Sequence, residues 1–170
     1  MTTPTMATAF SIEEVLALAE QIERDGERFY QGAAWRCTDL RGKEALEHLA
    51  RWEGSHQTVL RGLRERIRSA QDPRSRDFDP EGTAERYVIA ALDGHVFRAV
   101  GGPQDLLRAT DGPRAIFELA LRFERDSIAF LEALSPLLVG EIAGSIAELI
   151  AEEREHVTYL ERVLAYGNWS

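Results

Sequence analysis

Cysteine, basic charge and long apolar runs are scarce in this 170-residue sequence, and each shortage excludes a class of protein. Cys37 is the single cysteine, which rules out a disulfide framework, a cysteine-rich zinc site and a rubredoxin-type iron site. The formal net charge of -9 argues against nucleic acid as a partner and against a basic membrane-binding surface. No uncharged apolar run approaches the roughly 20 residues of a membrane span, and residues 1–10 lack the features of a signal peptide. We therefore expect a soluble, cytoplasmic protein without a membrane partner.

Strand patterns are almost absent as well, whereas helical periodicity covers most of the sequence. Four long helices are expected, in two pairs at about 11–69 and 111–166, with a short connection inside each pair. A longer, partly helical crossover at about 70–110 joins the pairs, as in bundles with one long connection. The predicted fold is all-α, a four-helix bundle that forms a single domain over residues 1–170.

Local signals support this layout. Ser11 followed by Glu14 fits a capping box at the start of the first helix. The polar segment 71–82 contains two prolines and a glycine, and is expected to be a loop. Short helices are predicted within the crossover, at about 83–92 and 103–109.

The tetrapeptide Glu-x-x-His occurs twice, as Glu53 to His56 and as Glu153 to His156. Each copy is preceded, about thirty residues upstream, by one further glutamate: Glu23 and Glu124. The two halves of the sequence therefore look like a duplicated helix hairpin, which would place two half-sites about a pseudo-two-fold axis.

These acidic and histidine residues lie on the apolar stripes of their helices. The stripes of the second and fourth helices read Leu46, Leu49, Glu53, His56, Leu60, Leu63 and Ile146, Leu149, Glu153, His156, Leu160, Val163. Burying unpaired charge is expensive, and a pair of divalent metal ions is the simplest arrangement that would stabilise it. The alternative is a buried salt-bridge network, which we disfavour because no arginine or lysine occupies these stripe positions.

We predict a dinuclear metal site with six ligands: Glu23, Glu53, His56, Glu124, Glu153 and His156. Residues at i and i+3 project from one face of a helix, so each Glu-x-x-His pair can reach a shared centre. In the expected arrangement Glu53 and Glu153 bridge the ions, and each ion has one histidine and one further glutamate. Four carboxylates balance two divalent ions, and the mixed oxygen and nitrogen ligands suit iron or manganese, with zinc as another occupant.

Over residues 11–166 the sequence resembles the rubrerythrin branch of the ferritin-like superfamily. The segments that carry the resemblance are Ile22–Tyr30, Leu49–His56, Phe123–Phe130 and Glu152–His156. The resemblance implies a ferritin-like bundle, a non-haem di-iron centre that reacts with O2 or hydrogen peroxide, and a homodimer.

Two departures from rubrerythrins restrict the expected function. The sequence has no paired cysteines for a rubredoxin module, and it has Leu121 and Ser127 where a second glutamate of the third helix would lie. We therefore expect a ferroxidase- or peroxidase-like oxidoreductase that uses an external electron donor, which the sequence does not identify. The alternatives are a non-catalytic protein that binds or buffers iron or holds zinc, and a subunit or cargo of a larger iron-storing shell.

Several residues near the motifs allow two interpretations. Auxiliary carboxylates could come from Glu20, Glu27, Glu152 and Glu155, although we expect most of them to be solvated. Asp25 and Asp126 are expected to pair with surface arginines rather than to orient a ligand histidine.

The remaining aromatic and histidine residues are assigned more simply. Tyr30 and Tyr159 are interpreted either as core residues or as hydrogen-bond donors near the metals. His48 and His95 are interpreted as non-ligands. Trp52 is expected to pack on the crossover or in a dimer interface.

Overall fold

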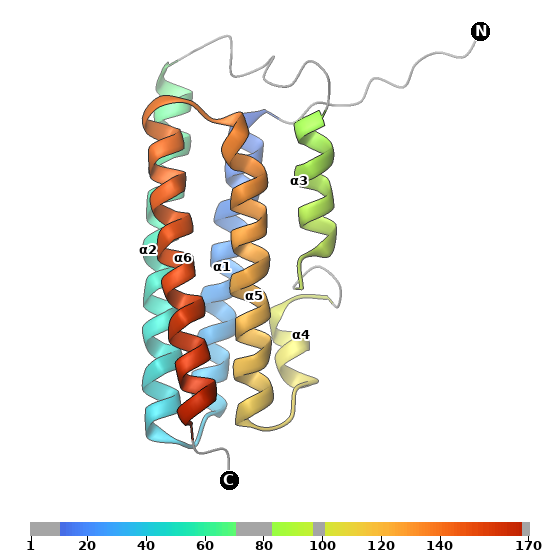
Figure 1. The fold of residues 1–170 in the computed structure, drawn as a ribbon, viewed down its shortest axis with the longest axis vertical. Coiled ribbons are helices and arrows are strands. Elements are labelled where there is room, and N and C mark those ends of the chain that lie inside the picture. The colour runs from blue at the N-terminus through green and yellow to red at the C-terminus, as the bar shows by residue number, and fades with distance from the viewer. Residues whose placement is uncertain (1–10, 71–82, 97–100, 168–170) are drawn as a thin grey trace, which may run out of the picture.

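The computed structural model describes residues 11–70, 83–96 and 101–167. Its long helices are α1 (Ile12–Arg36), α2 (Leu40–Ala70), α5 (Pro113–Leu134) and α6 (Gly140–Tyr166), and no strand occurs within those described ranges. Figure 1 shows the four helices side by side, with α1 and α6 running in one direction and α2 and α5 in the other. The predicted all-α four-helix bundle is confirmed.

The ends of the helices follow from local chemistry. Ser11 and Glu14 form the expected capping box: the Glu14 N–H donates to Ser11 Oγ at 3.2 Å, and the Ser11 N–H donates to Glu14 Oε2 at 2.7 Å. At the start of α5, Gly112 has a φ of 83°, which favours glycine, and Pro113 takes the first helical position, where its missing N–H costs nothing.

The crossover contains the two short helices predicted for it, α3 (Thr83–Gly94) and α4 (Pro103–Arg108). In Figure 1 they lie along one side of the bundle, where α3 packs on α5 and α4 packs on α1. The backbone N–H of Val96, just after α3, donates to Asp126 of α5 at 2.9 Å. Asp126 therefore anchors the crossover, while its expected pairing with a surface arginine stays a prediction. The predicted loop at 71–82 lies outside the described residues.

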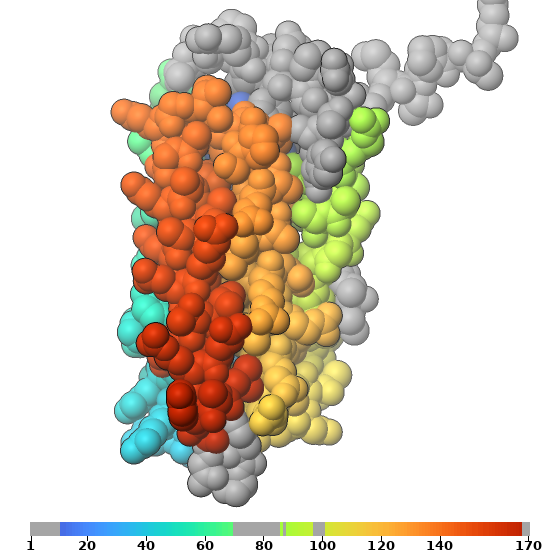
Figure 2. Space-filling view, viewed as in Figure 1, coloured from blue at the N-terminus to red at the C-terminus, as the bar shows by residue number. Residues whose placement is uncertain are grey.

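Leucine and phenylalanine side chains from all four long helices fill the interior. The largest fully buried apolar side chains include Phe29, Leu46, Leu60, Phe117 and Phe130. Figure 2 shows the outer face that α5 and α6 form, with α3 and α4 beside them. None of the described helices is long and apolar enough to cross a membrane.

Candidate metal centre

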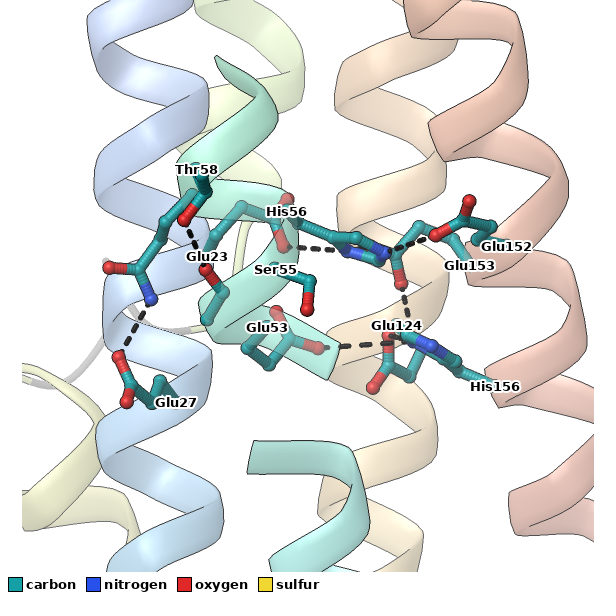
Figure 3. Close-up of polar contacts among 12 residues, drawn as sticks. Glu23, Glu27, Glu53, Ser55, His56, Thr58, Glu124, Glu152, Glu153 and His156 are labelled. Atoms are coloured by element: carbon teal, nitrogen blue, oxygen red, sulfur yellow. Dashed lines mark hydrogen bonds and ion pairs between the residues drawn. The ribbon is translucent and has the colours of Figure 1, made fainter. Parts of the chain in front are cut away.

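Six acidic and histidine side chains meet in the middle of the bundle, and all four long helices contribute to them. They are Glu23 from α1, Glu53 and His56 from α2, Glu124 from α5, and Glu153 and His156 from α6. Figure 3 shows them directed into the space between these helices, and each is at most 2% exposed. The structure thus brings together the complete set of residues that the sequence selected, while their binding of metal stays a prediction.

The two histidines present the same ring nitrogen to the carboxylates. His56 Nδ1 lies 2.6 Å from Glu153 Oε1 and 3.4 Å from Glu23 Oε2. His156 Nδ1 lies 3.0 Å from Glu153 Oε2 and 3.5 Å from Glu124 Oε2. The imidazole rings are stacked, with centroids 5.2 Å apart. Each half of the bundle therefore supplies one histidine and one terminal glutamate to its own side of a shared centre.

Glu153 lies between the two halves, with one carboxylate oxygen toward each histidine. Single ligand atoms of Glu53, His56, Glu153 and His156 all lie within 4.8 Å of one another. Glu53 Oε1 is also 3.9 Å from His156 Nδ1. This placement suits Glu53 and Glu153 to the bridging positions predicted for them.

The Glu53 carboxylate fits a cation best of all the groups in the centre. Both of its oxygens are buried, and neither has a hydrogen-bond partner among the described residues; the same holds for Glu124 Oε2. A buried carboxylate oxygen without a hydrogen-bond donor is strongly unfavourable. A divalent cation would give these oxygens their partner, and the donor set of four carboxylates and two imidazoles suits iron or manganese.

The pKa shifts show how the metal-free cluster distributes its protons. Burial, followed by the charges of Glu124, Glu23 and Glu153, raises the pKa of Glu53 well above its ordinary value. Burial opposes the charged form of the histidines, but their carboxylate contacts outweigh it and raise the pKa of His56 to about 11 and of His156 to about 9. The cluster therefore retains protons at neutral pH, and these protons must leave when a cation binds.

Tyr30 was interpreted either as a core residue or as a hydrogen-bond donor near the metals, and the structure shows the hydrogen bond. It is fully buried, and its hydroxyl donates to Glu124 Oε1. Burial and the nearby Glu124 raise the pKa of the phenol, so the proton stays on the oxygen that donates. Tyr30 therefore fixes one oxygen of Glu124 and leaves Oε2 directed toward His156.

Two side chains approach the histidines from outside the six-residue cluster. Glu152 Oε2 lies 3.0 Å from His56 Nε2, as Figure 3 shows. Trp52 stacks on the ring of His156, with centroids 4.6 Å apart. The aromatic partners of Trp52 thus lie on α2 and α6 rather than on the crossover, and its place in a dimer interface stays a prediction. Both contacts cross from α2 to α6, so spacing along a single helix could name Glu152 as a possible auxiliary carboxylate but could not show which histidine it contacts.

The other candidate carboxylates have structural partners away from the centre. Glu20 contacts Arg24 at 2.9 Å and Arg64 at 2.5 Å. Glu27 accepts from Gln57 Nε2 at 2.8 Å. Asp25 accepts from Gln21 and lies 3.8 Å from Arg28, as the expected surface pairing requires, and Glu155 is exposed.

The remaining aromatic candidates do not join the cluster. The Tyr159 ring packs edge-on against Trp52 and His48, and within the described residues its hydroxyl forms no hydrogen bond with the six cluster residues. His48 stacks on Trp52 at 4.0 Å, and His95 is buried against Phe123. Neither histidine belongs to the group of potential metal ligands that the described residues form.

Gly26 is a further residue that the centre needs, because no larger side chain fits there. A Cβ atom at this position would lie within 2.6 Å of the Phe123 ring and 3.0 Å from Glu53 Oε2. Glycine in this turn of α1 lets the ring and the carboxylate pack directly against the helix backbone. Position 26 lies on the same stripe as Glu23, one turn further along α1.

Gly26→Ala is expected to lower the free energy of unfolding by roughly 1–3 kcal/mol, because overpacking outweighs the gain in helix propensity. Urea unfolding of the metal-free protein measures this change. Gly62→Ala is the matched control: Gly62 is also helical, and its Cβ would meet nothing within 4 Å. The control should gain up to about 1 kcal/mol. Equal gains for both variants would show that the space beside Glu53 is not tight.

Comparison with known proteins supports the fold. The sequence matches no family profile and no curated protein. Among solved structures, the chain is similar to a proposed ferritin-like diiron-carboxylate protein from Thermotoga maritima, with a TM-score of 0.68 and 19% sequence identity. The alignment covers 95% of this chain and 99% of that one. This likeness concerns the fold alone, and the chain has the fold of a ferritin-like four-helix bundle.

Proposed function

We propose that the chain binds two divalent metal ions, with iron as the expected occupant, and that this centre reacts with O2 or hydrogen peroxide. The activity would be that of an oxidoreductase of the ferroxidase or peroxidase type. The observation that carries the proposal is the Glu53 carboxylate, buried with both oxygens lacking a hydrogen-bond partner among the described residues. The similarity of the fold to that of a proposed diiron-carboxylate protein supports the proposed metal centre.

The six side chains would bind the metals in bridging and terminal positions. Glu153, which faces both histidines, and Glu53 would bridge the two ions. Glu23 with His56, and Glu124 with His156, would complete the two ends. Iron bound here would supply the one-electron chemistry that the side chains lack. The protein would contribute the fixed geometry, the Tyr30 hydrogen bond to Glu124 and exclusion of water.

The burial of the six side chains favours a small reactant over a large organic substrate. Two surface hollows, of about 520 and 500 Å³, lie over α1–α2 and near the ends of α2, α5 and α6. Neither is lined by any of the six cluster residues. Because the ligands are at most 2% exposed, O2, peroxide and metal ions are the reactants that suit the centre.

The test is anaerobic loading with Fe(II), followed by exposure to O2 or to hydrogen peroxide. The wild type should bind two iron ions per chain, as the ferritin-like ligand template requires. It should then oxidise them faster than Fe(II) in buffer. Glu155→Gln, which changes an exposed carboxylate on the same helix, should behave like the wild type. The double variant Glu53→Ala/Glu153→Ala should bind no iron and match the buffer rate.

A second candidate function is metal binding without turnover, as in iron buffering or a structural zinc site. The burial of every ligand favours it, since a closed centre can hold a metal without exposing it to reactants. Stoichiometric iron that is oxidised no faster than free Fe(II) would establish this second function. The rubrerythrin branch, the homodimer, the cytoplasmic location and the external electron donor stay predictions.

A further inference from the structure

The internal repeat is broken at the position just before each bridging glutamate. Trp52 precedes Glu53 on α2, and Glu152 precedes Glu153 on α6, so the repeat has an indole in one half where it has a carboxylate in the other. Each of these side chains crosses to the histidine of the opposite helix. The two half-sites therefore share the same ligands but differ in what holds their histidines.

The His56 half has a hydrogen bond on the outer nitrogen of the ring. Nε2 lies 3.0 Å from Glu152 Oε2, and Nδ1 faces Glu153 and Glu23. Since a carboxylate only accepts, Nε2 must carry the proton in this contact. With its proton on Nε2, a neutral imidazole presents the lone pair of Nδ1 to the centre, which is the form a metal binds. Glu152 thus prepares His56 as a ligand, although its own side chain is 57% exposed.

The His156 half is held by ring stacking instead. The Trp52 indole lies nearly parallel to the imidazole, with an interplanar angle of 20°, and His48 stacks on Trp52 in turn at 23°. Stacking fixes the plane of the ring but does not select which nitrogen carries the proton. Within the described part of the chain, no hydrogen bond to His156 Nε2 is formed.

We propose that the two metal positions are unequal, and that Glu152 makes the His56 position the one that fills first. The inference rests on the proposed dinuclear centre and assigns Glu152 as a positioning residue that acts through His56. Carboxylates that accept from the outer nitrogen of a ligand histidine typically change metal affinity by roughly 10- to 100-fold. The His156 position, without such a partner, should therefore fill at higher metal concentration.

Anaerobic titration with Co2+ tests this order, because the d–d absorption counts bound ions and paramagnetic proton NMR reports each ligand histidine. A histidine bound through Nδ1 gives one far-shifted, solvent-exchangeable resonance from its Nε2–H. One such resonance should appear with the first equivalent of Co2+ and a second only with the second equivalent. The first resonance should exchange slowly with solvent, because Glu152 holds its proton.

Three variants assign the effect to Glu152. In Glu152→Ala the first binding step should weaken by roughly 10- to 100-fold, and the first resonance should shift and exchange faster. Glu152→Gln keeps a neutral acceptor, whose hydrogen bond to His56 is about half as strong as that of the carboxylate. Its first binding step should therefore be tighter than that of Glu152→Ala but weaker than that of the wild type. Glu155→Ala removes an exposed carboxylate from the same helix and should leave both steps unchanged.

Two results would overturn the inequality while leaving the centre intact. The first is a pair of resonances that grow together from the start of the titration. The second is identical behaviour of Glu152→Ala and Glu155→Ala. Failure of the wild type to bind any Co2+ would instead remove the proposed function, and the inequality with it.

Discussion

Glu53→Gln is expected to make the metal-free protein more stable while abolishing its binding of two iron ions per chain. The wild-type carboxylate is buried, its oxygens accept no hydrogen bond from the described residues, and its pKa is raised by burial and by Glu124 and Glu23. Glutamine has nearly the same shape without an ionisable carboxyl, so its burial costs less than that of a carboxylate. The gain in free energy of unfolding at pH 8 should be about 1–2 kcal/mol.

Urea unfolding of the metal-free protein measures the gain, and iron content after anaerobic loading measures the loss of binding. A neutral amide oxygen cannot balance the charge of two divalent ions, so we expect no tightly bound iron. A variant that is less stable than the wild type without metal would contradict this account. It would mean that Glu53 is held by structural contacts rather than kept for a cation.

Glu20→Gln is the matched control, because Glu20 is also buried, at 4% exposure, but is fully paired. Arg64 and Arg24 lie 2.5 and 2.9 Å from its oxygens. Burial acts to raise the pKa of Glu20, but Arg64 and Arg61 outweigh it and lower this pKa. Removing this charge should destabilise the protein by on the order of 1 kcal/mol, since the arginines are partly exposed, and should leave iron content unchanged. A gain in stability for Glu53→Gln and a loss for Glu20→Gln would show that Glu53 is kept for a metal ion, whereas Glu20 has a structural role.

The sequence predicted the fold and the six-residue cluster because both depend on periodicity within single helices. Glu53 and His56 lie on the same stripe as Leu49 and Leu60, and burial of that stripe carries them into the core. The first helix also had a marked start, the capping box of Ser11 and Glu14. Apolar stripes that must be buried leave few alternatives to a bundle whose centre receives all the polar stripe residues.

The surroundings of the cluster could not be predicted in the same way, because they depend on how one helix is shifted along another. Glu152 is exposed and off the core stripe, so nothing in the spacing of α6 indicates that it reaches His56 on α2. Trp52 reaches His156 for the same reason. Gly26 is readable as a stripe residue, but the close approach of Phe123 and Glu53 follows only from the packing of three helices. The position of Gly26 on the same stripe as Glu23 was the one feature of the sequence that could have indicated its role.

The metal-free protein is also expected to lose stability as pH rises, and the stabilisation by metal is expected to grow. The pKa of His56 is raised to about 11 and that of His156 to about 9, both above the ordinary value of 6.5. The folded cluster therefore keeps protons that the unfolded chain releases, so the free energy of unfolding falls through this range. Glu53 and Glu124, with raised pKa values, act in the same direction from pH 4.5 upward. Glu153, whose pKa is lowered by His156 and His56 despite its burial, acts oppositely but only below pH 4.5.

The size of the effect follows from the number of protons retained. One proton kept by the folded state costs about 2.7 kcal/mol between pH 6.5 and 8.5, or roughly 5–10 °C in Tm for a chain of this length. Metal ligands must be deprotonated, so binding releases these protons and removes the penalty. Thermal unfolding with chelator and with Mn2+, at both pH values, should show a gap in Tm that widens as pH rises.

A variant without the two histidines separates this mechanism from a general effect of pH. His56→Asn/His156→Asn lacks two of the groups that hold extra protons above pH 6.5, so its metal-free Tm should fall less than that of the wild type as pH rises. Glu155→Gln should keep the wild-type dependence, since its side chain is exposed to solvent. A metal-free wild type whose Tm is constant or rises from pH 6.5 to 8.5 would show that the histidines are neutral in the absence of metal. The centre would then be preorganised for a cation without proton release, and its affinity would not depend on pH in this range.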